Sequence, residues 1–141
     1  MHFAIDGHDK ADSLAQIIGA AWQGGVSKFR HGPLALKIEP SPVSQGIGSV
    51  EFTDESYWNL IGHFEDTQIV ASSVEDAEPR PQIWMRPHGK GRVFVCIPGH
   101  YTWTFDDPLY RLLLLRGISW AGGQTPDFLS DLACVGARIR N

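Results

Sequence analysis

The chain has 141 residues, 43% of them hydrophobic, which suits one globular domain with its own core. Twelve Lys and Arg residues against sixteen Asp and Glu residues give a formal net charge of −4 without a basic stripe, so nucleic acid is not an expected partner. Apolar stretches fall far short of the ~20 residues of a membrane span, and no basic segment leads into an apolar one at the N-terminus. We therefore expect a cytoplasmic protein with no membrane partner.

The first half of the chain predicts short strands around one helix. Residues 3–5 are apolar and lead into Asp6-Gly7-His8, which predicts a strand that ends in a Gly-His pair. Apolar residues recur at helical spacing over residues 12–23, and Gly24-Gly25 supplies a C-terminal stop. Short strands are expected next, at residues 34–38, 50–52 and 68–72.

A hairpin is predicted in the second half. The glycine turn of residues 87–91 joins residues 82–86 to residues 92–97, which favours an antiparallel pair of strands. Residues 93–97 are continuously apolar, as in a strand buried on both faces, and the run stops at Gly99-His100. In open α/β sheets, ligands bind at the carboxyl ends of the strands. His8 and His100 are therefore predicted to lie on one rim.

The hairpin is followed by a second predicted helix. Asp107 is a suitable N-cap and Pro108 suits the first helical position, while Gly122-Gly123 ends the leucine-rich segment. A short helix is expected around residues 126–132. Because strands and helices alternate along the chain, the expected fold class is α/β with a mixed sheet.

The two cysteines show no spacing that points to chemistry. Cys96 falls in the apolar strand and Cys134 near the C-terminus, without a Cys-x-x-Cys motif or the cysteine density of a secreted framework. Both are expected to be reduced, unreactive thiols.

Several short motifs stand in a specific order along the chain. They are His31-Gly32, Thr53-Asp54-Glu55-Ser56-Tyr57, Ile83-Trp84, Gly89-Lys90-Gly91-Arg92-Val93-Phe94, Gly99-His100 and Arg116-Gly117-Ile118-Ser119-Trp120-Ala121-Gly122. Together they resemble the trehalose-utilisation (ThuA-like) family, over a stretch from about Phe3 to Gly123.

The resemblance implies the fold of class I glutamine amidotransferases, a flavodoxin-like parallel sheet between helices with an added antiparallel hairpin. Residues 1–123 then form the ThuA-like domain and residues 124–141 a C-terminal extension. Family members have one or two further strand-helix units before the first strand, so the chain corresponds to the C-terminal part of the domain. Apolar surface that those units would cover is expected to be exposed in this chain, which predicts that two copies associate as a homodimer.

The same resemblance implies a role in sugar catabolism, with trehalose-type disaccharides and their keto derivatives as substrates. Glutamine amidotransferase chemistry needs a cysteine nucleophile on a sharp strand-to-helix turn. The corresponding turn reads Asp6-Gly7-His8-Asp9. The absence of a thiol there argues against a glutamine amidotransferase.

Imidazoles and carboxylates on the predicted rim supply the groups that acid-base catalysis requires. We expect His100, Glu55 and His8 to be the catalytic residues. Other side chains from the family motifs and the hairpin are expected to bind the substrate: His31, Asp54, Tyr57, Trp84 and Arg86.

Three hypotheses for the function stay open. One is a hydrolase or lyase that moves protons on a sugar or keto-sugar. In the second, a divalent metal such as zinc, held by His8, His31 and His100, polarises a substrate carbonyl. The third is a sugar-binding or regulatory module without catalysis.

Overall fold

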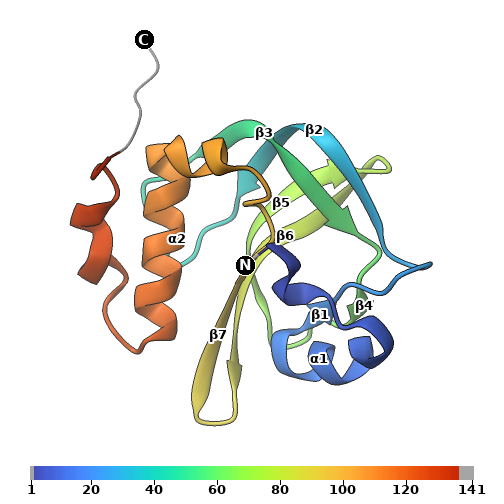
Figure 1. Ribbon diagram of the computed structural model, residues 1–141. Helices are drawn as coiled ribbons and strands as arrows, with labels where there is room; N and C mark the ends of the chain where they lie inside the picture. The colour runs from blue at the N-terminus through green and yellow to red at the C-terminus, as the bar shows by residue number, and fades with distance from the viewer. Residues whose placement is uncertain (1, 137–141) are drawn as a thin grey trace.

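The computed structural model describes residues 2–136 and is shown in Figure 1. The elements in chain order are η1 (His2–Ile5), η2 (His8–Lys10), α1 (Ala11–Ile18), β1 (Ala20–Ala21), β2 (Lys28–Ile38), β3 (Ser49–Trp58), β4 (Ile61–Gly62), β5 (Gln68–Glu75), β6 (Glu78–His88), β7 (Gly91–Cys96), η3 (Thr102–Asp106), α2 (Pro108–Ala121) and η4 (Pro126–Leu132), where η marks a 3-10 helix. Helices and a sheet are both present, so the predicted α/β class is confirmed.

Five strands form one sheet in the order β3-β2-β5-β6-β7, and every neighbouring pair is antiparallel. The predicted mixed sheet, with the parallel strands of a flavodoxin-like fold, is therefore wrong for these five strands, and the flavodoxin-like arrangement is not confirmed. Parallel neighbours need a crossover connection of a dozen or more residues, usually a helix. Between residues 28 and 96 the strands are joined without a helix. Three pairs are therefore hairpins, β2–β3, β5–β6 and β6–β7, while β5 returns to pair with β2. The predicted antiparallel hairpin of β6 and β7 is confirmed.

Helices lie on both sides of this sheet, with α2 on one side and α1 on the other (Figure 1). The first helix stops at Ile18, five residues before its predicted end. Gly19 takes the positive φ of +99° that ends many helices, and its N–H bonds to the Ala15 carbonyl. Ala20–Ala21 then pairs with Ile61–Gly62 as a separate two-stranded sheet.

The second helix begins and ends where the sequence predicts. The Asp107 carboxylate accepts a hydrogen bond from the Tyr110 N–H at 2.8 Å, with Pro108 in the first turn. Gly117 lies so close to the Phe94 ring that a Cβ there would be 2.3 Å from it, which lets α2 pack tightly on β7. The η4 helix covers another side of α2, as the predicted short helix, while residues 137–141 of the predicted extension lie outside the described residues.

Two segments at the start of the chain differ from the prediction. The predicted strand at residues 3–5 is part of the 3-10 helix His2–Ile5, because its only strand-like pairing is a single bridge between Asp6 and Trp22. The predicted strand at residues 34–38 begins earlier, at Lys28, so that His31 lies within β2. Ten cross-strand pairs between β2 and β3 hold this longer segment extended.

The sheet curls until its edge strand β3 meets β6. There the Gln82 side chain takes the place of a neighbouring strand: its Oε1 accepts from the Tyr57 N–H at 3.2 Å and its Nε2 donates to the Tyr57 carbonyl at 2.9 Å. Gln82 has no solvent exposure. Two backbone groups that an edge strand would leave unpaired inside the protein are thereby satisfied.

The surface of α2 and η4 keeps several exposed apolar side chains, namely Leu109, Ile118, Phe128 and Leu132. The homodimer stays a prediction. Within residues 2–136, none of the helices has the length and apolar character that crossing a membrane demands.

The Gln82 contact gives a prediction about stability. Replacing Gln82 with Leu keeps most of the side-chain volume but removes both hydrogen bonds from Gln82 to the buried backbone of Tyr57, which costs about 2–4 kcal/mol of unfolding free energy. Chemical denaturation measures this loss. Gln68→Ala is the control, because Gln68 makes one exposed bond to the Pro40 carbonyl, and its effect should stay within about 0.5 kcal/mol. Equal losses in the two variants would contradict the proposed role of Gln82.

Candidate functional site

The pairing of β2 with β3 places three of the predicted site residues on one face of the sheet. His31 is the direct cross-strand partner of Glu55, and Phe29 is the partner of Tyr57. Directly paired residues, and residues two apart on one strand, point to the same face. His31, Glu55 and Tyr57 therefore share a face, while Asp54 points to the other one.

The segment after β7 brings His100 to this face. The buried Asp54 carboxylate accepts the Gly99 N–H at 3.0 Å and the His100 N–H at 3.1 Å, and it also accepts the Glu55 N–H at 2.7 Å. The Thr104 hydroxyl donates a further bond to it. Three of these four donors, from Gly99, His100 and Thr104, belong to the segment after β7 and hold it against β3 at the residue next to Glu55.

Only glycine fits before the histidine in this segment. Gly99 has a φ of +127°, and a Cβ on it would lie 3.0 Å from the Phe105 ring and 3.2 Å from the Tyr110 hydroxyl oxygen. That hydroxyl donates to the Pro98 carbonyl at 2.7 Å. The Gly-His pair of the sequence is thus a tight, anchored turn that presents the His100 ring.

His100, Glu55 and Tyr57 form the polar centre of the face. The His100 Nδ1 lies 3.3 Å from Oε2 of Glu55, and the Tyr57 hydroxyl donates to the same oxygen. The His100 side chain is 35% exposed whereas that of Glu55 is 11% exposed, so the carboxylate lies behind the imidazole. Burial, and then the bond to Glu55, raise the pKa of the Tyr57 hydroxyl, which keeps it a neutral donor.

Two aromatic residues that the sequence analysis did not select complete this surface. The Tyr101 ring lies 4.4 Å from the His100 ring and 5.1 Å from the His31 ring, between centroids. Trp103 stacks on Tyr101 at 4.2 Å, and its Nε1 donates to the Thr53 carbonyl at 2.8 Å. The Tyr101-Thr102-Trp103 segment directly after the Gly-His pair, with its two aromatic residues, was the available signal.

The structure places the other predicted site residues elsewhere. Trp84 is fully buried beneath α1 and donates to the Ile18 carbonyl at 2.6 Å, so it holds the end of that helix. Arg86 lines a separate hollow of about 780 Å³ with His63 and carboxylates from α1 and the segment after β4. His8 lies on η2 with its side chain 87% exposed, and its Nε2 is 3.7 Å from the Asp6 carboxylate. Asp54 lies inside the protein as the anchor described above.

The predicted zinc site requires three protein ligands that converge on one point. Within residues 2–136, no group of three or more His, Cys, Asp or Glu side chains is arranged to hold a metal ion. The described part of the chain therefore does not bring His8, His31 and His100 together as the predicted ligand set.

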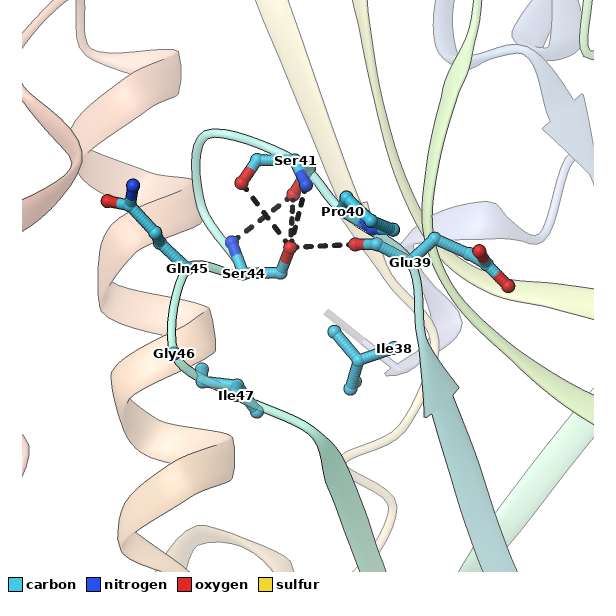
Figure 2. Close-up of a pocket in the computed structure, with 8 residues that line it drawn as sticks. All are labelled: Ile38, Glu39, Pro40, Ser41, Ser44, Gln45, Gly46 and Ile47. Carbon is cyan, nitrogen blue, oxygen red and sulfur yellow. Dashed lines mark hydrogen bonds between the residues drawn. The ribbon is translucent and has the colours of Figure 1, made fainter.

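A hollow of about 400 Å³ lies beside the loop that joins β2 to β3 (Figure 2). Its two serine hydroxyls bond to each other at 2.8 Å, and Ser44 Oγ also donates to the Glu39 carbonyl at 2.7 Å. Figure 2 shows these groups turned into the loop itself. Their hydrogen bonds hold the shape of the turn, so this hollow is not the candidate site.

Neither cysteine belongs to the site. Cys96 is buried and its Sγ lies 3.5 Å from the Tyr110 hydroxyl oxygen, whereas Cys134 is exposed, and both are free thiols. Burial raises the pKa of the Cys96 thiol to about 12. Because the thiolate is the nucleophilic form, Cys96 is unreactive near neutral pH.

Comparison with known proteins gives one match. The family model for ThuA, described as trehalose utilisation, matches residues 1–121 of the 141-residue chain. No curated protein and no solved structure matches the chain. The matched range contains the whole Asp54 anchor and the Glu55–His100 pair.

The anchor leads to a second prediction. Asp54→Asn turns one acceptor oxygen into a donor that faces N–H groups, so we expect a loss of about 2–3 kcal/mol in unfolding free energy. Hydrogen exchange at the Gly99 and His100 amides should accelerate at the same time. Asp131→Asn, at an exposed position, is the control and should change neither quantity. Unchanged exchange at both amides in Asp54→Asn would refute the anchoring role.

The thiols give a third prediction. A thiol with a pKa of about 12 is ionised in about one molecule in ten thousand at pH 8. Iodoacetamide at pH 8 should therefore label Cys134 alone in the folded protein and both cysteines in denaturant, as mass spectrometry will show. Labelling of Cys96 at the rate of Cys134 in the folded protein would show that the thiol is accessible and activated.

Proposed function

Because the chain belongs to the ThuA (trehalose utilisation) family, we propose that it acts on a sugar or keto-sugar derived from a trehalose-type disaccharide, by proton transfer at His100. The observation that carries the proposal is the 3.3 Å contact between His100 Nδ1 and the Glu55 carboxylate. Buried carboxylates that accept from one imidazole nitrogen orient the ring and stabilise its protonated form. Proton exchange with the substrate then falls to Nε2.

Tyr57 supports this pair by holding the carboxylate. Its hydroxyl donates to the same Glu55 oxygen that faces His100, and its raised pKa keeps that donor protonated over the working pH range. A carboxylate fixed by a neutral donor keeps its position when the imidazole gains or loses a proton. Glu55 and Tyr57 are therefore positioning residues, and His100 is the proposed catalytic residue.

A keto-sugar suits this arrangement because its carbonyl acidifies the hydrogen on the neighbouring carbon. His100 takes that proton, and the electron pair of the C–H bond moves onto the carbonyl oxygen as an enolate. When the enolate reforms the carbonyl, a carbon–carbon double bond forms and the glycosidic oxygen on the next carbon leaves and is protonated. The proposed reaction is thus a lyase step, in which His100 transfers the proton without a redox change.

Exchange in heavy water tests the proton transfer directly. NMR of a keto-disaccharide derived from trehalose should show protein-dependent deuterium incorporation at the carbon next to the carbonyl. His100→Ala should lower this rate by ~100-fold or more, since general base catalysis contributes that much. Glu55→Gln should lower the exchange rate less, because this change removes the carboxylate that orients the His100 ring but leaves His100 itself as the base.

Matched controls come from strands of the same sheet. Glu51→Gln changes an exposed carboxylate of β3, and His88→Ala changes an exposed imidazole of β6, so both should keep the wild-type rate. His8→Ala tests whether His8 takes part, as the sequence predicted. Calorimetry with the same sugar shows binding: sugar bound without exchange or turnover would refute the catalytic proposal and favour the sugar-binding module.

A further inference from the structure

A second imidazole lies on the face that carries the Glu55–His100 pair. His31 is the direct cross-strand partner of Glu55, and the Cβ atoms of such a pair lie about 4.5–5.5 Å apart. The Glu55 carboxylate is also the group that faces the His100 Nδ1 at 3.3 Å. His31 is an exposed residue of β2, so its ring can meet a ligand that lies on this face.

Tyr101 limits the distance between the two imidazoles. Its ring centroid lies 4.4 Å from that of His100 and 5.1 Å from that of His31, with interplanar angles of 71° and 60°. The tyrosine ring is held in turn by Trp103, which stacks on it with 6° between the ring planes and donates to the Thr53 carbonyl. Because both imidazoles contact one fixed ring, their centroids cannot be farther apart than these two distances added together.

This spacing suits two proton transfers on neighbouring atoms of one substrate. In the lyase step proposed above, the carbon that loses a proton and the oxygen that leaves are two bonds apart. The approach of a proton acceptor or donor adds about 3 Å at each end. Two imidazoles within the limit that Tyr101 sets can therefore reach both ends of this fragment, His100 at the carbon and His31 at the oxygen.

The surroundings of the two imidazoles differ in a way that separates base from acid. His100 faces the buried Glu55 carboxylate through Nδ1, an arrangement that favours uptake of a proton at Nε2. Within residues 2–136, no ion pair joins His31 to a carboxylate, and its ring meets Tyr101 instead. An imidazole without a carboxylate partner releases its proton more readily than one that faces a carboxylate. His31 is therefore the better proton donor of the two.

The proposed lyase step needs such a donor. A glycosidic oxygen leaves poorly as an alkoxide, because the negative charge then stays on that one oxygen. A positioned acid that protonates the oxygen as its bond to carbon breaks contributes about 10²–10⁴-fold to the rate. A single imidazole would have to carry its proton from the carbon to the oxygen, whereas a second imidazole acts without that movement.

We propose that His31 is a second catalytic residue, the general acid that protonates the glycosidic oxygen as it leaves. The carbon–oxygen bond breaks with its electron pair on the oxygen, and the His31 imidazolium gives that oxygen its proton. His100 keeps the proton taken from carbon, and exchange with water then restores both imidazoles. The assignment rests on the lyase step proposed above and goes beyond the substrate binding that the sequence predicted for His31.

Two leaving groups of different acidity test the acid role. The keto derivative of trehalose expels glucose, which needs the acid, whereas a 4-nitrophenyl glucoside with the same keto group expels 4-nitrophenolate, which is stable without protonation. His31→Ala should slow protein-dependent glucose release by ~100-fold or more and leave 4-nitrophenolate release close to wild type. Deuterium exchange next to the carbonyl should continue at the wild-type rate, because His100 remains, and this exchange also shows that the variant is folded.

Two further variants separate proton donation from binding. His31→Gln keeps a side chain that donates a hydrogen bond but transfers no proton, so it should lose as much glucose release as His31→Ala. His63→Ala removes an exposed imidazole that lines the separate hollow with Arg86, and it should keep the wild-type rate with both substrates.

The outcomes distinguish this assignment from the proposed function. If the wild-type protein causes neither exchange nor cleavage of the keto derivative, both are refuted. If it causes exchange without cleavage, the lyase step and the acid role are refuted, while proton transfer at His100 stands. If His31→Ala releases glucose as fast as wild type, only the acid role is refuted. Equal losses with the two leaving groups, recovery in His31→Gln, or lost exchange in His31→Ala would assign His31 to binding or folding and also refute the acid role.

Discussion

The rest of the site depends on the hydrogen bonds that the Asp54 carboxylate accepts. It is fully buried, where an uncompensated carboxylate would be very unfavourable, and it is compensated by three backbone N–H groups and one hydroxyl. Two of those N–H groups belong to Gly99 and His100. The hydrogen bonds that compensate the buried Asp54 carboxylate therefore also bring the His100 imidazole to β3.

Strand alternation turns this one anchor into a site. Asp54 points into the core and the next residue, Glu55, points to the opposite face, so the anchor and the Glu55 carboxylate are adjacent in sequence but lie on opposite faces of the sheet. His100 follows the anchored Gly99 and faces Glu55. Because the anchor and the Glu55–His100 pair lie on different faces, the Asp54 carboxylate is buried while the imidazole keeps contact with solvent.

The edge position of β3 has a further consequence. An edge strand offers unpaired backbone groups that must find partners when they are buried. In this protein the Gln82 amide satisfies Tyr57, and the Trp103 indole donates to the Thr53 carbonyl. The edge of β3 thus contacts β6 through Gln82 at Tyr57, and it fixes the Trp103 side chain beside the site at Thr53.

The sequence alone determined the features that depend on neighbouring residues: the Asp107-Pro108 start of α2, the glycine turn of the β6–β7 hairpin, and His100 and Glu55 as motif residues worth testing. The tertiary structure decided what depends on distant partners. Strand direction, the early end of α1 at Gly19, the burial of Trp84 and Asp54, and the meeting of Tyr101 with His31 all follow from pairing and packing between segments far apart in the chain. Caps and turns are local hydrogen bonds that a short motif encodes, whereas burial and strand pairing depend on which segments meet.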